Sequence, residues 1–272
     1  MTLPTALVIG PMKAGTSWIY QYLLTRQDVC LPAGIKETFY FDRYASRGDE
    51  WYRKHFSHYD PSCHKVIVEV APTLFHSSDA PGRIRTSLGT VPLIVTLRDP
   101  IKRAWSHYMH LQRKGFTRKD LTSALEHFPE ILDASLFDAQ LERWCSEMPG
   151  SPLTVLRLED LIADREAYTK ALCEALNLPF QQAPEHLGET NAGGIPPSFL
   201  VAKLGRQAAD IIRWGGGYRI VNFAKKVGLK DIFFGANGAQ RIKPTEDEIA
   251  LLAERLNEQI AWKERLYRSP EA

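Results

Sequence analysis

The segment Ala6–Leu24, ALVIGPMKAGTSWIYQYLL, constrains the fold more than any other part of the chain. Its first four residues are apolar, and the run is interrupted at Gly10 and Pro11. A helical pattern begins at about Gly15, and its apolar face is formed by Ile19, Tyr20, Leu23 and Leu24. The segment therefore predicts a buried strand, a tight turn of small residues and a helix, in that order.

A turn of this kind suits an anion. The first turn of a helix leaves backbone N–H groups unpaired, and the helix dipole places partial positive charge there. Lys13 adds a full charge inside the turn, and the hydroxyls of Thr16 and Ser17 add donors. The segment predicts a site for a phosphate-like group; an ordinary strand-to-helix turn with a solvated lysine is the alternative.

The turn differs from the common nucleotide-triphosphate loop. That loop reads G-x-x-x-x-G-K-[ST], with the lysine directly after the second glycine. Here Lys13 stands two residues before Gly15, so the cation lies in the loop and not on the helix. A different phosphate geometry is expected.

The following 150 residues alternate between strand patterns and helix patterns. Further strands are expected at 29–31, 65–70, 92–97 and 153–158, and helices at 50–56, 81–88, 101–113, 121–127, 135–147 and 165–176. The alternation predicts an α/β fold, with a P-loop-like parallel sheet flanked by helices. We expect one domain over 1–272, with an α/β nucleotide-binding core in 1–182 and a loop and helical part in 183–272.

The C-terminal part has its own pattern. Proline, glycine and polar residues fill 179–198, which predicts a functional loop, and 199–214 and 218–227 have helical patterns. Basic residues in 199–234 could contact a membrane surface or an acidic acceptor, with a solvated basic face as the alternative. Thr245 and Glu248 form a capping box, and the last helix is expected to bury Ile249, Leu252, Leu256 and Ile260.

A second anion site is predicted within Leu93–Tyr108, LIVTLRDPIKRAWSHY. Arg98 follows a buried strand, and ligands of open parallel sheets bind outside the carboxyl ends of strands. Its guanidinium can engage two phosphate oxygens. Arg103 and Ser106 share one face of the next helix, so the Ser106 hydroxyl could reach the same anion. A surface arginine and a solvent-facing serine are the alternative.

Together the two segments resemble sulfotransferases that use 3′-phosphoadenosine 5′-phosphosulfate (PAPS). Residues 10–18, GPMKAGTSW, are similar to the 5′-phosphosulfate loop of that family. Residues 98–108 match its 3′-phosphate motif, R-x-P-x-x-R-x-x-S-x-Y. The motifs stand in the family's order and separation, and the resemblance covers at least Ala6–Leu176.

The resemblance implies a role for each matching residue. Lys13 would contact the transferring sulfuryl group and the bridging oxygen. The donor would be bound by Lys13, Ala14, Gly15, Thr16, Ser17, Trp18, Arg98 and Ser106. Trp18 could equally belong to the core. PAPS would be the co-substrate and adenosine 3′,5′-bisphosphate the product, without a metal: Arg98 ends a strand where an NTPase would place a magnesium-binding aspartate.

Within the family the chain is most similar to the carbohydrate branch, with its heparan sulfate enzymes, and to bacterial members. Glu37 precedes Phe39, Tyr40 and Phe41 as in that branch, which implies that Glu37 is the general base. Glu69 and His76 remain alternative bases.

One position departs from the branch's pattern. Val70 stands where glycan enzymes often place a lysine after a glutamate, so a lysine contribution to the acceptor side is missing or comes from elsewhere. We therefore expect sulfuryl transfer to a hydroxyl, with an amine as the alternative, of a glycan, glycolipid or small molecule. The rival functions are a nucleotide-dependent phosphotransferase and a non-catalytic nucleotide-binding module.

Charge, hydropathy and residue spacing argue against nucleic-acid-binding, membrane-spanning and zinc-binding proteins. A net charge of +2 gives no argument for a nucleic-acid partner, and no apolar run is long enough for a membrane span. His55, His58, Cys63 and His64 have no zinc-site spacing. The chain enters its first strand without a leader, and its four cysteines have no paired spacing, so we expect free thiols and a cytoplasmic location.

Overall fold

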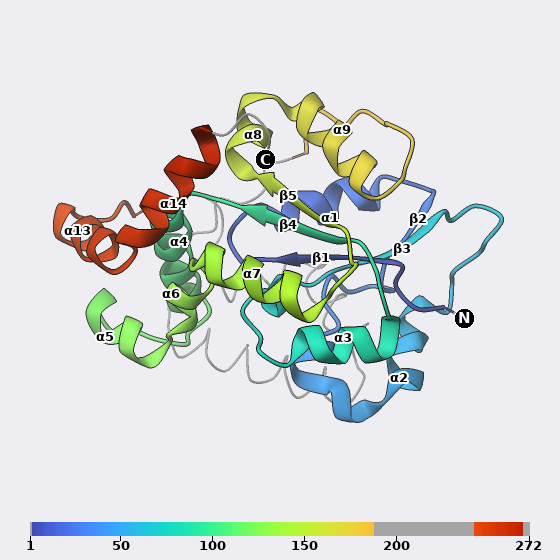
Figure 1. Cartoon of the computed structure of the whole chain (residues 1–272), viewed down its shortest axis with the longest axis horizontal. Coiled ribbons are helices and arrows are strands. Elements are labelled where there is room, and N and C mark those ends of the chain that lie inside the picture. The colour runs from blue at the N-terminus through green and yellow to red at the C-terminus, as the bar shows by residue number, and fades with distance from the viewer. Residues whose placement is uncertain (1, 188–241, 269–272) are drawn as a thin grey trace.

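The computed structural model describes residues 2–187 and 242–268, and its centre is a parallel sheet (Figure 1). Within the described residues the sheet has the strand order β2-β3-β1-β4-β5. The strands are β1 (Ala6–Gly10), β2 (Val29–Cys30), β3 (Val66–Val70), β4 (Leu93–Leu97) and β5 (Leu153–Arg157). Every pairing is parallel. The predicted α/β fold with a P-loop-like parallel sheet is confirmed.

Helices follow the strands along the chain. They are α1 (Thr16–Leu24), α2 (Asp49–Arg53), α3 (Ala80–Leu88), α4 (Pro100–Arg113), α5 (Leu121–His127), α6 (Glu130–Asp133), α7 (Phe137–Glu147), α8 (Leu158–Ala163), α9 (Arg165–Ala175), α13 (Glu246–Arg255) and α14 (Asn257–Arg268). Short helical turns are η1 (Tyr40–Tyr44), η2 (Ala45–Arg47), η3 (Lys54–Phe56) and η4 (Pro72–Leu74). The sequence pattern did not predict α6 and α8.

The sheet is buried on both faces because side chains alternate along each strand. Val8 and Ile94 point into a core with residues of α1 and α9, whereas Leu7 and Val95 point into a core with residues of α2, α3 and α7. Figure 1 shows these helices on opposite sides of the sheet. This two-faced burial explains why β1, β3 and β4 are continuously apolar apart from Thr96 and Glu69.

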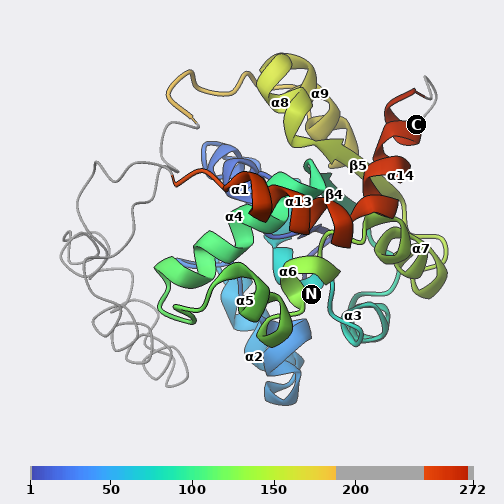
Figure 2. The same cartoon turned by 90° about the vertical axis from the view of Figure 1, so that its left-hand side faces the viewer.

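A third apolar cluster lies beyond the carboxyl ends of the strands, as Figure 2 shows end-on. It joins α4, α5, α6 and α13 through buried residues that include Ala104, Leu111, Leu252 and Leu256. Helix α13 therefore packs against the helix that follows β4, whereas Trp262 of α14 packs against Phe137 of α7.

The predicted C-terminal helix differs in two respects from the structure. It ends at Arg255, and a second helix starts at Asn257. The capping box of Thr245 and Glu248 is confirmed. Leu252 and Leu256 are buried as expected, but Ile249 is 42% exposed, and Ile260 is half-buried in the second helix. The helices predicted at 199–214 and 218–227 lie outside the described residues.

The apolar face of α1 also differs in one position. Ile19 and Leu23 are buried as predicted, but Leu24 is 52% exposed and Tyr22 is buried in its place. The Tyr22 ring stacks on the ring of Trp18, one turn earlier. The helix is therefore rotated relative to the predicted face, because aromatic residues on the neighbouring stripe fill the core.

Candidate active site

The loop between β1 and α1 is fixed by two glycines. Gly10 has φ +115°, and a Cβ atom there would lie 2.5 Å from the carbonyl oxygen of Pro72. Only glycine tolerates both conditions without rearrangement. Gly15, with φ +103°, forms the N-cap position of α1. The chain therefore leaves β1 in direct contact with η4 and then turns sharply into the helix.

Three consecutive carbonyl groups of this loop are held from β4 and α4. Arg103 NH1 donates to the oxygen of Met12 (3.3 Å), Arg98 NH1 to that of Lys13 (3.1 Å), and Thr96 Oγ1 to that of Ala14 (2.8 Å). The peptide groups of the loop are thus oriented by side chains of the second predicted motif. The two predicted anion-binding segments are therefore in direct contact.

Cationic side chains surround the Lys13 amine. Burial is the main cause that lowers its pKa to about 8, and four positive charges lower it further. Those charges belong to Arg113, Arg98, Lys36 and Lys114. Like charges gathered around a buried lysine disfavour its protonated form unless an anion is bound between them. The arrangement therefore favours an anionic ligand with more than one charge.

The first turn of α1 lies within this cluster. Thr16 is buried, and its Oγ1 accepts a hydrogen bond from Lys36 Nζ (3.2 Å), whereas Ser17 is exposed. Trp18 is 7% exposed, lies against Tyr22 and Tyr168, and donates from Nε1 to the oxygen of Leu187 (3.3 Å). The structure thus places its indole in the core, which was the alternative interpretation.

The start of α4 presents the second motif. Asp99 caps the helix by accepting a hydrogen bond from the Lys102 N–H (2.9 Å). This cap fixes the helix directly after Arg98. Ser106 is half-buried on the same helix, two turns further on, whereas Arg103 is completely buried beneath it. Arg98 itself lies beside Lys13, because its guanidinium donates to the Lys13 carbonyl, and the phosphate interpretation requires this proximity.

Glu37 lies at the edge of the cationic cluster. Its Oε1 is 3.3 Å from Lys36 Nζ, the same amine that donates to Thr16. Burial raises the pKa of Glu37, and the Lys36 charge opposes that shift. A raised pKa makes a carboxylate a better proton acceptor.

Glu69 holds the chain next to Glu37. Its carboxylate is 1% exposed and accepts hydrogen bonds from the Thr38 N–H (2.6 Å) and the Tyr52 hydroxyl (2.6 Å). Burial raises the pKa of Glu69 to about 7, and the hydrogen bonds oppose that shift. Both oxygens are thus engaged inside the protein, which favours a positioning role for Glu69 over that of a base.

Val70 is the last residue of β3, and His76 follows η4, the helical turn that contacts Gly10. Val70 is completely buried in the sheet, so the position of the family's lysine contributes to the core. Burial lowers the pKa of His76 to about 4, and nearby arginines, Arg103 first among them, lower it further. His76 is therefore neutral at pH 7. Its Nδ1 is buried without a hydrogen-bond partner among the described residues.

Sequence reasoning missed several residues of the cluster. They are Lys36, Thr96, Arg113 and Lys114. Helical periodicity could have indicated Arg113, which lies seven residues, or two turns, after Ser106 and so falls on the same face of α4. Lys36 gives no local signal, because only the tertiary structure brings it to Thr16.

Among residues 2–187 and 242–268, no group of three or more His, Cys, Asp or Glu side chains is arranged to hold a metal ion. In the same ranges no helix has the length and hydropathy needed to cross a membrane.

The chain is similar to known sulfotransferases. Residues 61–182 match the model of a family described as "Sulfotransferase family". The membrane-associated sulfotransferase kil1 of Dictyostelium discoideum is 37% identical over 109 residues, which are 40% of this chain and 23% of that protein. The human heparan sulfate glucosamine 3-O-sulfotransferase 3B1 is 29% identical over 171 residues, 60% of this chain and 43% of that protein. The chain thus spans less than half the length of either relative.

The fold has a bacterial counterpart. The crystal structure of a sulfotransferase from Alicyclobacillus acidocaldarius is similar with a TM-score of 0.61 and 19% identity, over 78% of this chain and 94% of that one. This likeness concerns the fold. The family match includes the Arg98 motif, and the relatives extend the similarity beyond it. Residues 61–182 thus match the sulfotransferase family, and the chain is similar in sequence to heparan sulfate sulfotransferases and in fold to a bacterial sulfotransferase.

Proposed function

We propose that the protein transfers a sulfuryl group from PAPS to a hydroxyl group of an acceptor, with an amine as the alternative. One observation carries the proposal: side chains of β4 and α4 hold the three carbonyls of the Lys13 loop, so that Lys13 and Arg98 lie on one rim of the sheet. A donor with phosphates at both ends of an adenosine needs two cationic subsites in one cleft.

In this proposal the 5′ end of the donor occupies the first turn of α1. The N–H groups from Ala14 to Trp18 and the hydroxyls of Thr16 and Ser17 would donate to the 5′-phosphate. Arg98 and Ser106 would bind the 3′-phosphate. The surrounding cations, Arg113 and Lys114 among them, match the charge of a bisphosphate.

The reaction requires a charge stabiliser and a base. As the acceptor oxygen bonds to sulfur, the bond from sulfur to the bridging oxygen breaks, and negative charge builds on the departing phosphate. Lys13 and the α1 N-terminus would stabilise that charge. Glu37 would accept the acceptor's proton, helped by its raised pKa. No residue in this scheme needs a metal.

The relatives bear on the class of acceptor. Those named for heparan sulfate include both 3-O- and N-sulfotransferases, which supports a glycan acceptor. Val70 removes one lysine from the acceptor side. A glycolipid or a hydroxylated small molecule is therefore an alternative acceptor. We expect a hydroxyl as the site of sulfation, and Glu37 would accept its proton.

A thermal-shift experiment tests the donor assignment. Adenosine 3′,5′-bisphosphate at about 100 times its dissociation constant should stabilise the protein by roughly 2.7 kcal/mol. The shift should disappear in Arg98→Ala. It should persist in Arg85→Ala, a matched variant whose guanidinium donates to the oxygen of Glu147 on α7. Labelled PAPS with heparan sulfate and small alcohols would then identify the acceptor.

The rival phosphotransferase makes the opposite prediction. ATP with magnesium would stabilise the protein more than the bisphosphate does, and Arg98→Ala would have little effect. That result would refute the sulfotransferase proposal for this site. Binding of the bisphosphate with no turnover in Glu37→Gln and in the wild type alike would favour the non-catalytic module.

A further inference from the structure

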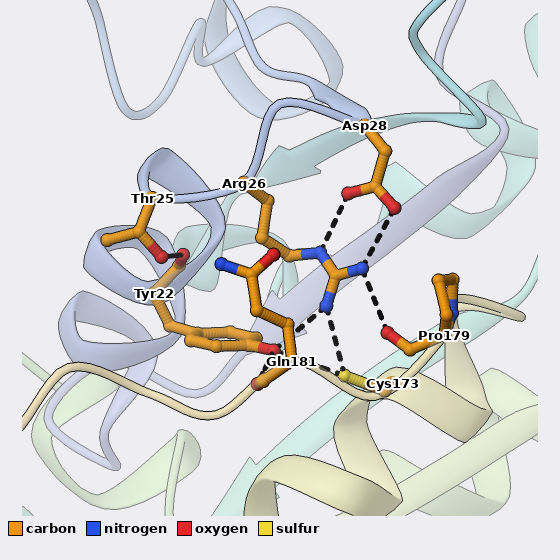
Figure 3. Close-up of polar contacts among 7 residues, drawn as sticks. All are labelled: Tyr22, Thr25, Arg26, Asp28, Cys173, Pro179 and Gln181. Carbon is orange, nitrogen blue, oxygen red and sulfur yellow. Dashed lines mark hydrogen bonds and ion pairs between the residues drawn. The ribbon is translucent and has the colours of Figure 1, made fainter.

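Two arginine side chains are buried in the described part of the chain, and they differ in their partners. Arg26 is 5% exposed and Arg103 is 0% exposed. Figure 3 shows Arg26 between α1 and the segment after α9, where its Nε and NH2 donate to the carboxylate of Asp28 (2.8 and 2.9 Å). The remaining donors reach Pro179 and Tyr22. The charge of Arg26 is therefore balanced inside the protein.

Arg103 forms no such ion pair, although the Asp133 carboxylate acts on its charge from a greater distance. Its donors reach the hydroxyl of Ser135, the carbonyls of Met12 and Ile131, and Nδ1 of His107. All four partners are neutral groups, because burial and the Arg103 charge itself lower the pKa of His107 well below 7. No carboxylate of the described residues lies within ion-pair distance of Arg103.

A buried charge without an ion-pair partner destabilises the folded state. A neutral side chain at this position would therefore give a more stable protein. Burial and the neighbouring charge of Arg98 lower the pKa of Arg103 to about 9, and the Asp133 carboxylate opposes that shift, so the guanidinium stays protonated at pH 7. The carbonyl that Arg103 holds belongs to Met12, the residue before Lys13. The buried charge therefore lies directly behind the predicted donor site.

We propose that Arg103 is a positioning residue of this site, and that its charge is balanced by the phosphates of the bound donor instead of by an ion pair with a protein carboxylate. The proposal rests on the proposed function. Arg103 connects the two subsites physically, because it projects from α4, which carries Ser106, and bonds to the loop that carries Lys13.

The test compares Arg103→Met, Arg103→Lys and Arg26→Met in the full chain. Two quantities are measured: the melting temperature without ligand, and the dissociation constant of adenosine 3′,5′-bisphosphate by calorimetry. Arg103→Met should weaken bisphosphate binding at least about tenfold, because the charge is lost. Arg103→Lys should weaken it less, because the charge remains although the forked contacts are lost.

Arg26→Met is the matched control. It should lower the melting temperature more than Arg103→Met does, because it leaves the Asp28 carboxylate without a partner. Its dissociation constant for the bisphosphate should stay within about twofold of the wild type. A purely structural role of Arg103 would instead reduce stability as Arg26→Met does and leave binding unchanged.

Three results would overturn the proposal. The first is binding by Arg103→Met within twofold of the wild type. The second is an equal loss of bisphosphate affinity in Arg103→Lys and Arg103→Met, since the charge of residue 103 would then not matter for binding. The third is a wild type that does not bind the bisphosphate, which refutes the proposed function as well. If Arg103→Met does not fold, Arg103→Gln, which keeps a donor but no charge, replaces it in the same comparison.

Discussion

At the scale of single residues, Lys13 shows how the fold changes a side chain's chemistry. Its backbone adopts a left-handed φ of 71°, and Arg98 holds its carbonyl. Burial and neighbouring cations lower its pKa to about 8. A lysine with this pKa is partly deprotonated just above neutral pH, and a bound phosphate reverses that by favouring the protonated form.

Bisphosphate binding should therefore weaken as the pH rises through 8. In the free protein Lys13 loses its proton over that range, and binding must restore it. We expect affinity about tenfold lower at pH 9 than at pH 7. Lys13→Arg should flatten the profile, because arginine stays charged. Calorimetry across this range checks the prediction, and an unchanged slope in Lys13→Arg would contradict it.

Glu69 gives a second pH-dependent prediction, which concerns a carboxyl group and the stability of the fold. Its pKa is raised from 4.5 to about 7 in the folded protein, so the folded state holds a proton that the unfolded chain releases. The stability from this proton is fully present below pH 4.5 and is lost as the pH rises through 7. The loss is on the order of 3–4 kcal/mol.

Urea unfolding at pH 5 and pH 8 measures this contribution. The wild type should lose more stability between these two pH values than Glu69→Gln, which cannot titrate. Glu142→Gln, an exposed position on α7, should keep the wild-type difference. Equal differences in all three proteins would show that Glu69 titrates normally.

At the scale of elements, the contact between the β1–α1 loop and η4 depends on one glycine. The sequence predicted β1, the turn and α1, because apolar runs and small residues are local signals. It did not predict that η4 closes against Gly10, because that contact joins segments more than 60 residues apart. Likewise α6 and α8 were missed because four to six residues give too short a period.

Gly10→Ala should destabilise the protein by about 2–4 kcal/mol, because the new Cβ meets the Pro72 carbonyl at 2.5 Å with an unfavourable φ. Gly82→Ala is the matched control: it lies within α3, and a Cβ there meets nothing within 4 Å. That change should be neutral or stabilise by up to about 1 kcal/mol. Chemical denaturation measures both, and similar effects at the two sites would contradict the argument.

At the scale of the whole molecule, α13 supports the helix that carries the second motif. Leu252 of α13 and Leu256, which caps its C-terminus, pack with Ala104 and Leu111 of α4. Figure 2 shows α13 and α4 at the same end of the molecule. The site thus depends on residues some 150 positions apart in the sequence. That residues 1–272 form a single domain remains a prediction.

Leu252→Ala should cost about 2–5 kcal/mol, because the side chain is completely buried. Ile249→Ala should cost less than about 1 kcal/mol, because that side chain is 42% exposed. Equilibrium unfolding of both variants checks the corrected face of α13. A larger loss at Ile249 would support the stripe expected from the sequence.

The sequence by itself determined the order of strands and helices, the loop at Lys13 and the motif at Arg98. These are local signals: hydrophobic period, small residues at turns, and short motifs that read directly along the chain. It also placed Glu37 as the candidate base, which remains a prediction.

Only the tertiary structure decided how these parts act together. It brought Lys36, Arg113 and Lys114 around Lys13, engaged Glu69 with Thr38, and buried Arg103 without an ion pair to a carboxylate of the described residues. Such arrangements depend on strand order and helix packing, which join distant segments. Charge, burial and pKa are properties of that assembled environment, so no local pattern in the sequence encodes them.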